Sequence, residues 1–393
     1  MLGFITKIPL LEGQMKKVLL LLELSTVDWG SKNAGGLDTV CQQIASSIEA
    51  SECKDFKYVI VAFSIPKNSL TKPICRNINP NVTIVFYSNL QKLRVIPNFL
   101  ARAIVARRHF NIEKPDIVHS HLMPLLLLIP RSAKSILTLH SYKKFGRKSV
   151  GLINDFIHET IIPRFVLPRV SAINTIGSDL KNLVNQDGYV AGKIVNPIDP
   201  IFSSNYCKRD FSLISTKFLI CGNIHPYKGT LEGIQLFKRI VSSGFSAHLT
   251  VVGQKVDLEY LTKIQKYIAD HSLEDLVSII DPLPKVKLVE LYKSNQYGIF
   301  LSKQESFGLV PIEMASTGMK VLVHKVGVLA DSDFNFPADQ FFIVDENVNI
   351  DELTAFLTEN LEYGLGYVLE RFNITHVLQE QEKQYINSLS VVA

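Results

Sequence analysis

Two glutamates in the second half of the chain have a spacing that suits sugar chemistry. Glu305 and Glu313 are eight positions apart and flank Gly308, which allows a ligand to approach the backbone. Pro311 favours the first turn of a helix, and the N–H groups at such a helix start attract anions. We therefore predict that the two carboxylates bind sugar hydroxyls beside a phosphate. An ordinary helix start is the alternative, since the helix dipole also favours glutamate there.

The residues around these glutamates predict the elements that hold them. Residues 299–301 form a short apolar run bounded by polar residues, which is typical of a buried parallel strand. Apolar residues then recur at helical spacing from Pro311, Gly318 stops the helix, and residues 321–323 form the next strand. The predicted unit is strand, loop, helix, strand.

A lysine follows another predicted strand at a distance that suits phosphate binding. The strand at 218–220 is followed by Gly222, and Lys228 lies six positions after that glycine, just before a helical pattern. This spacing places an ammonium group at the carboxyl end of the strand, where a diphosphate can bind. Because this ammonium group can meet the charge of the diphosphate, we predict a metal-independent site.

Two features of the first half are candidates for the same ligand. His140 follows the predicted strand at 135–139, where active-site loops emerge, whereas His119 lies within a strand and is interpreted as structural. Gly35 and Gly36 precede a helical pattern, so their backbone can admit phosphate or sugar. A plain turn explains the paired glycines equally well.

Together these motifs resemble those of retaining glycosyltransferases with the GT-B fold, in particular glycosyltransferase family 4. Glu305 and Glu313 match the E-x7-E signature of that family. The resemblance implies that Glu305 holds the transferred sugar, that Glu313 holds the ribose, and that His140 acts near the anomeric carbon. It also implies a UDP- or GDP-sugar as donor and no cofactor. The residues it assigns to donor binding are Gly35, Gly36, Asn223, Lys228, Leu283, Ser306, Phe307, Gly308, Leu309 and Glu313.

One motif departs from the family pattern. The usual arginine of the family's G-R-L-x-x-x-K-G motif is Asn223 here, so only Lys228 of that pair remains for the diphosphate. Residues 195–199 match the family's P-N-G-V-D motif loosely. Two alternatives stay open: a non-catalytic partner subunit of the same fold, which Asn223 motivates, and a GT-B sugar-nucleotide epimerase or phosphorylase.

Strands and helices alternate along the chain, which predicts an α/β fold. The 393 residues allow two or three domains, and we predict two doubly wound, Rossmann-like parallel-sheet domains facing a cleft. The other strands are predicted at 18–22, 58–62, 83–86, 117–119, 172–175, 249–252 and 278–280. The predicted parts are an extension at 1–14, an acceptor-binding domain at 15–200, a linker at 201–216, a nucleotide-sugar domain at 217–370 and a last helix at 371–393. The resemblance implies that this helix crosses back to the first domain.

Basic residues are concentrated in the first half. Residues 1–200 contain 25 Lys and Arg against 14 Asp and Glu, whereas residues 201–393 contain 17 against 23. The excess lies mostly between 51 and 150 and includes Lys143, Lys144, Arg147 and Lys148. We predict that this half binds an anionic acceptor, a glycan or lipid-linked glycan, or an anionic membrane surface; a solvated face is the alternative. Nucleic acid is not expected, because no interleaved aromatic residues or known nucleic-acid motif accompany these charges.

Cysteine usage and hydropathy favour the cytoplasm. The five cysteines contain no C-x-x-C pair and are odd in number, which argues against a disulfide framework or a zinc site. No run reaches the roughly 18 apolar residues that a membrane-spanning helix needs. We predict a cytoplasmic protein, with peripheral attachment to the inner face of the membrane as a further hypothesis.

Overall fold

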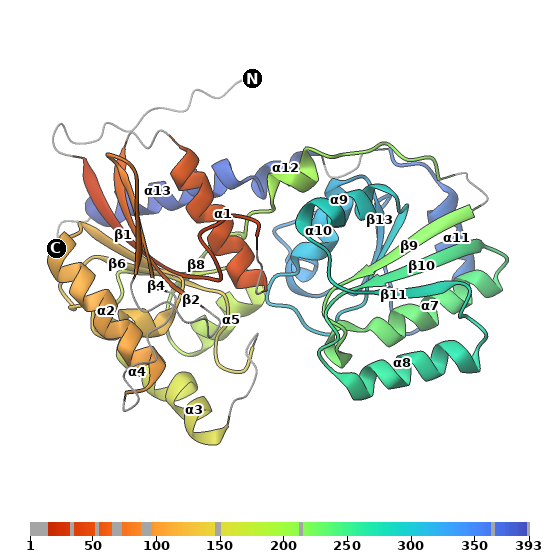
Figure 1. Ribbon diagram of the computed structural model, residues 1–393, viewed down its shortest axis with the longest axis horizontal. Helices are drawn as coiled ribbons and strands as arrows, with labels where there is room; N and C mark the ends of the chain where they lie inside the picture. The colour runs from red at the N-terminus through yellow and green to blue at the C-terminus, as the bar shows by residue number, and fades with distance from the viewer. Residues whose placement is uncertain are drawn as a thin grey trace. The chain divides into compact units, whose positions relative to one another are not determined.

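The chain forms two compact units in the computed structural model (Figure 1), which describes residues 15–31, 35–51, 55–64, 73–87, 96–145, 151–211, 215–362 and 366–390. The first unit contains Met1–Thr175, Lys181–Ile194 and Leu378–Ala393, and the second contains Ile176–Leu180 and Val195–Val377. The predicted extension at 1–14 and the basic residues Arg147 and Lys148 lie outside the described residues.

The described part of the first unit contains an eight-stranded sheet in the order β3-β4-β2-β1-β5-β6-β7-β8. Every pairing is parallel except that of β3 with β4. The central strands are covered on both faces, which explains the unbroken apolar run of β1. The strands are β1 (Lys16–Leu24), β2 (Phe56–Ser64), β3 (Ile74–Asn79), β4 (Val82–Tyr87), β5 (Ile117–Ser120), β6 (Ser135–Leu139), β7 (Ala172–Thr175) and β8 (Ala191–Lys193).

Helices cover this sheet, and the last helix of the chain is one of them. The helices are α1 (Gly36–Ala50), α2 (Asn98–Glu113), α3 (Leu152–Phe156), α4 (Ile162–Val166), α5 (Ser178–Gln186) and α13 (Ile374–Ser390). A π-helical turn, Ile157–Ile161, joins α3 to α4. From α13, Tyr385 Oη lies 2.7 Å from His119 Nδ1 on β5, and Glu382 accepts a hydrogen bond from Tyr58 of β2 at 2.8 Å.

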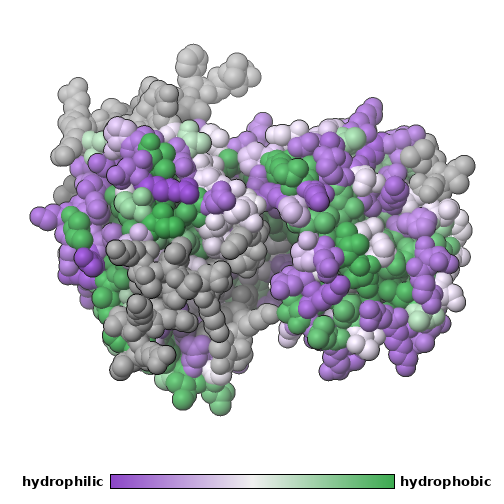
Figure 2. All heavy atoms as spheres, viewed as in Figure 1, coloured by the Kyte–Doolittle hydropathy of each residue, from purple (hydrophilic) through white to green (hydrophobic). Residues whose placement is uncertain are grey.

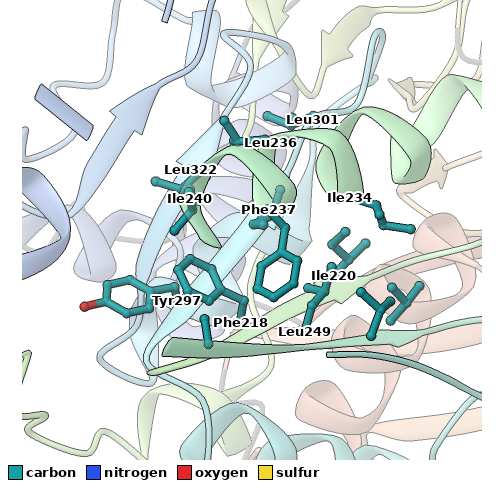
Figure 3. Close-up of a cluster of buried hydrophobic side chains, with 14 of the residues drawn as sticks. Phe218, Ile220, Ile234, Leu236, Phe237, Ile240, Leu249, Tyr297, Leu301 and Leu322 are labelled. Carbon is teal, nitrogen blue, oxygen red and sulfur yellow. The ribbon is translucent and has the colours of Figure 1, made fainter. Parts of the chain in front are cut away.

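The described part of the second unit contains a six-stranded parallel sheet in the order β11-β10-β9-β12-β13-β14. Its core is aromatic where the sheet meets α7: the ring of Phe218 stacks on Tyr297 at 4.7 Å and meets Phe237 edge-on at 5.6 Å (Figure 3). The strands are β9 (Ser215–Cys221), β10 (Ser246–Val252), β11 (Val277–Ile280), β12 (Tyr297–Phe300), β13 (Lys320–Val323) and β14 (Phe341–Ile343). The helices are α6 (Pro200–Ser203), α7 (Thr230–Ser242), α8 (Leu258–Asp270), α9 (Lys285–Lys293), α10 (Leu309–Ser316), α11 (Ile350–Thr358) and α12 (Gly366–Arg371).

Both sheets reverse their strand order once near the middle. In the first unit the reversal lies between β1 and β5, and in the second it lies between β9 and β12. In open parallel sheets, ligands bind at the carboxyl ends of the strands beside such a reversal. The candidate sites are therefore expected in the loops that follow these four strands.

The predicted strands are all present, with three additions and one corrected helix boundary. β3, β8 and β14 were not predicted, and the expectation of parallel pairing is wrong for β3. The helix predicted from Pro311 begins earlier, at Leu309. Glu313 therefore lies in its second turn, and the prediction that Glu313 sits in the first turn is wrong. No helix among the described residues is long and apolar enough to cross a membrane.

Candidate active site

Lys228 lies in a turn that the end of β12 holds in place. The residue closes a short 3-10 turn in the loop after β9. Ser302 Oγ, just after β12, donates a hydrogen bond to Tyr227 O at 3.0 Å. A Cβ added to Gly229 would lie 2.0 Å from Leu301 O, so a residue with a side chain cannot make this approach. The loops after β9 and β12 are thereby fixed to each other.

This arrangement brings Lys228 onto Glu305. Lys228 Nζ and Glu305 Oε1 are 2.5 Å apart, with 36% of the lysine side chain and 13% of the glutamate side chain exposed. Gly308, with φ +88°, ends the loop and precedes α10. A Cβ added to Gly327 would lie 2.3 Å from Phe307 O, so a second close backbone approach supports the glutamate loop. The ion pair lies in the loops after β9 and β12, at the strand reversal, and the second of these loops leads into the start of α10.

Glu313 is buried on α10. Its side-chain environment raises its pKa to about 7, chiefly because burial disfavours the charged form; the nearby Lys285 opposes this shift and Asp199 adds to it. Lys285 Nζ and Asp199 Oδ2 form their own ion pair at 2.5 Å. Near neutral pH, Glu313 is therefore present in both protonation states and can donate or accept a hydrogen bond.

The remaining residues predicted for donor binding lie at the same carboxyl edge of the second sheet. Asn223 is exposed just after β9, and Leu283 is half-buried in the loop after β11. Ser306 and Leu309 are half-buried beside Gly308. Phe307 is 3% exposed, and its ring packs edge-on against Phe372 at 6.0 Å. A ligand contact from Phe307 would therefore come from its backbone.

His140 belongs to the first unit, where it lines a cavity of about 980 Å³ at the carboxyl ends of β1, β5 and β6. A cavity of this volume is large enough for a small-molecule ligand. Apolar side chains from α3 and the neighbouring loops form most of its wall. The polar lining includes Glu23, Arg102, His121, His140 and Lys143.

Three histidines form a group at this cavity: His119 and His121 are buried, and His140 is half-buried. His121 Nδ1 lies 2.9 Å from His140 Nε2, and His119 Nε2 lies 2.8 Å from Thr138 Oγ1. Burial lowers the pKa of His119 to about 3 and that of His140 to about 4, and it holds the pKa of His121 well below the ordinary value. All three are therefore neutral at pH 7. His121 lines the cavity, and its Nε2 is buried without a hydrogen-bond partner among the described residues.

Residues that the sequence analysis missed complete the polar wall. Arg102 of α2 pairs with Glu23 at 2.9 Å and also donates to Ser64 O at 2.8 Å. His121 and Glu23 end or directly follow buried strands, as His140 does, so the argument used for His140 also predicts them. Arg102 gave no such signal, because it lies on α2 and does not follow a strand.

Gly35 and Gly36 lie at the start of α1, beside the same cavity, which Leu37 lines. Gly35 has φ +127°, which side-chain-bearing residues rarely adopt, and no side chain caps the helix there. Among the described residues, a Cβ at either glycine would meet nothing within 4 Å. Among the described residues, no group of three or more His, Cys, Asp or Glu is placed to hold a metal ion.

The structure thus groups the predicted residues into two sets. Lys228, Glu305, Gly308 and Glu313 lie together in the second unit, and His140, Gly35 and Gly36 lie together in the first. Residues 211–363, which include the whole first set, match the family model of glycosyl transferases group 1. Over these residues the chain is similar to group 1 glycosyl transferases. The Lys228–Glu305 pair lies at the strand reversal within the matched segment.

Individual proteins are also similar to the chain. GDP-mannose:cellobiosyl-diphosphopolyprenol alpha-mannosyltransferase of Xanthomonas campestris is 20% identical over 298 residues, covering 72% of this chain and 73% of that protein. A glycosyltransferase of Rickettsia africae is 13% identical, with a TM-score of 0.66 over 97% of this chain and 100% of that one. HepE of Anabaena, solved in complex with UDP, is 13% identical, with a TM-score of 0.65 over 95% of this chain and 100% of that one. With its two Rossmann-like units, the chain has the GT-B fold.

Proposed function

We propose that the protein is a retaining, metal-independent glycosyltransferase of family 4 that moves a sugar from a UDP- or GDP-sugar to a glycan or lipid-linked acceptor in the cytoplasm. The observation that carries this proposal is the Lys228–Glu305 ion pair at the strand reversal of the segment that matches the group 1 glycosyl transferase model. The relative from Xanthomonas, which is named for GDP-mannose, and the Anabaena structure with UDP both support a nucleotide-linked donor.

The second unit supplies what a departing diphosphate needs. When the bond from the anomeric carbon to the diphosphate oxygen breaks, negative charge grows on that oxygen. The Lys228 ammonium and the start of α10 are positioned to stabilise this charge. Glu305 accepts hydrogen bonds from the sugar hydroxyls, and Glu313 contacts the ribose. With these positive groups in place, the departing diphosphate requires no divalent ion.

The configuration of the anomeric carbon is retained if the diphosphate leaves and the acceptor attacks on the same face of the sugar. The acceptor oxygen forms its bond to the anomeric carbon on the side that the diphosphate leaves, and the acceptor proton passes to the diphosphate oxygen. The neutral His140 and His121 act by hydrogen bonding at this stage and carry no charge at pH 7.

Nucleotide binding and sugar transfer test the proposal. Calorimetric titration with UDP and GDP should show binding, and Lys228→Ala should slow transfer about a hundredfold, as loss of one charged transition-state contact usually does. Lys303→Ala is the matched control, because Lys303 is a half-exposed lysine of the same unit that pairs with Glu232 instead. Near-normal turnover of Lys228→Ala would contradict the proposal that Lys228 stabilises the departing diphosphate.

Two further outcomes separate the alternatives. Transfer should continue in excess EDTA, and activity restored only by Mg²⁺ or Mn²⁺ would contradict the metal-independent mechanism. Nucleotide binding without transfer to any acceptor would favour the non-catalytic partner subunit that Asn223 motivates.

A further inference from the structure

The helical segment 152–169 of the first unit exposes large apolar side chains along one side. The exposed fractions are 90% for Leu152, 80% for Ile153, 58% for Phe156, 36% for Ile161 and 57% for Phe165. We call these five residues the apolar stripe. In Figure 2, hydrophobic atoms form the lower edge of the first unit, where Figure 1 places α3.

The stripe is one side of a segment whose other side is already packed. Ile162, Val166 and Leu167 of the same segment are each no more than 2% exposed. Leu152 and Ile153 are adjacent at the start of the segment, and the stripe residues after them follow at spacings of three, five and four positions along α3, the π-helical turn and α4. Large apolar side chains that gather on one exposed side mark an interaction surface, whereas single exposed ones need no explanation.

The stripe is continuous with the cavity that contains His140. Leu152 and Ile153 belong to both, and Ile157 and Ile162 of the same segment also line the cavity. An amphiphile bound along the stripe therefore has an apolar route to the polar groups at the base of the cavity.

The charge near the stripe identifies its partner. Arg164 is exposed within the segment, and Lys144 is exposed shortly before it. The other charged residues of the segment are less exposed, since Arg169 and Glu159 are half-buried and Asp155 is buried. A second copy of the chain would bring the same positive charge to the contact, whereas an acidic lipid surface complements both the charge and the apolar side chains.

We propose that the apolar stripe inserts into the interfacial layer of a bilayer with anionic headgroups, and that a lipid-linked acceptor passes from there into the His140 cavity. Entry of the acceptor into the cavity rests on the proposed glycosyltransferase function, whereas membrane docking does not. Insertion buries the apolar side chains, and Arg164 and Lys144 remain at headgroup level.

Vesicle co-sedimentation of the full chain tests this proposal. Wild type should bind vesicles of phosphatidylglycerol and phosphatidylcholine in equal parts, and bind less at high salt because the headgroup attraction is screened. Phe156→Ser combined with Phe165→Ser should weaken binding about a hundredfold, roughly tenfold for each large side chain removed from the bilayer. Neither phenylalanine lines the cavity.

The matched control is Val190→Ser combined with Leu258→Ser, since these apolar residues are 91% and 71% exposed but lie outside the stripe. This control should bind vesicles as wild type does. Equal vesicle binding by the Phe156/Phe165 variant and wild type would overturn the proposal. The proposal would also be overturned if wild type did not bind vesicles. This includes the outcome in which sedimentation shows that the stripe joins two copies of the chain. UDP and GDP titration of the same samples separates the two proposals, because the donor is assigned to the second unit.

Discussion

Burial sets the protonation of Glu313 in a way that stability measurements can detect. Its pKa is raised from 4.5 to about 7, so between these values the folded protein binds a proton that the unfolded chain releases. The free energy of unfolding should therefore fall as pH rises through this window, by on the order of 3 kcal/mol, relative to Glu313→Gln. Chemical unfolding of both proteins across the window measures the difference. Parallel pH curves would show that Glu313 is ionised in the folded state.

The histidines of the first unit should give the opposite slope. Because burial lowers the pKa of His140 from 6.5 to about 4, the unfolded chain binds protons in this window that the folded protein excludes. Acidification should therefore destabilise the first unit, and His140→Gln should reduce this sensitivity. His248→Gln, at an exposed histidine on β10, is the control and should leave the acid response unchanged. An unaltered slope in His140→Gln would mean that its imidazole is charged when folded.

At the scale of elements, the two ends of α7 offer a paired test of how Lys228 is positioned. Gly229, φ +64°, precedes the helix, and Gly244, φ +103°, follows it. Alanine at either position is strained by about 1–2 kcal/mol. At Gly229 the new Cβ also meets Leu301 O, whereas at Gly244 it meets open space.

Gly229→Ala should therefore lose more stability than Gly244→Ala and should also weaken nucleotide binding, since relief of the clash displaces Lys228. Thermal unfolding and UDP or GDP titration of the two variants measure both effects. Equal nucleotide affinity in the two variants would show that the 3-10 turn does not position Lys228.

Helices and strands with a clear pattern of apolar residues could be predicted from the sequence. Unbroken apolar runs such as that of β1 and stripes such as that of α7 predict their elements well, because burial alone decides them. β3 could not be predicted, since its residues are exposed or half-buried at the sheet edge and lack an apolar pattern. β8 and β14 are only three residues long, too short to show a period.

Residues of the candidate site could be predicted where they follow strands. The side-chain contacts that depend on packing could not be predicted. Lys228, Glu305 and His140 all follow strands, so their positions at strand ends could be inferred. Their contacts could not, because the Lys228–Glu305 pair depends on the close approach of Gly229 to Leu301. The histidine group likewise depends on a contact between residues that are 266 positions apart, His119 and Tyr385.

At the scale of the whole molecule, α13 is expected to support the first unit selectively. Tyr385 is 1% exposed and packs edge-on against Phe56 at 5.4 Å, besides its hydrogen bond with His119. Tyr385→Phe should lower the stability of the first unit by about 1–3 kcal/mol, because His119 Nδ1 is left buried without its partner. Lys383→Ala, at an exposed residue of the same helix, is the control.

Scanning calorimetry of these variants should resolve the effect. The transition of the first unit should move to lower temperature in Tyr385→Phe, while that of the second unit stays in place. A shift of both transitions by the same amount would instead indicate that the two units unfold together.

The return of the chain to its first unit also affects the order in which the protein is completed during synthesis. The strands of the first unit leave the ribosome early, yet the partners of Tyr58 and His119 are Glu382 and Tyr385, on a helix translated after the entire second unit. A nascent chain that stalls before α13 would leave this side of the first sheet uncovered, and chaperones bind such apolar surfaces. The unit that is translated first is therefore the one that finishes folding last.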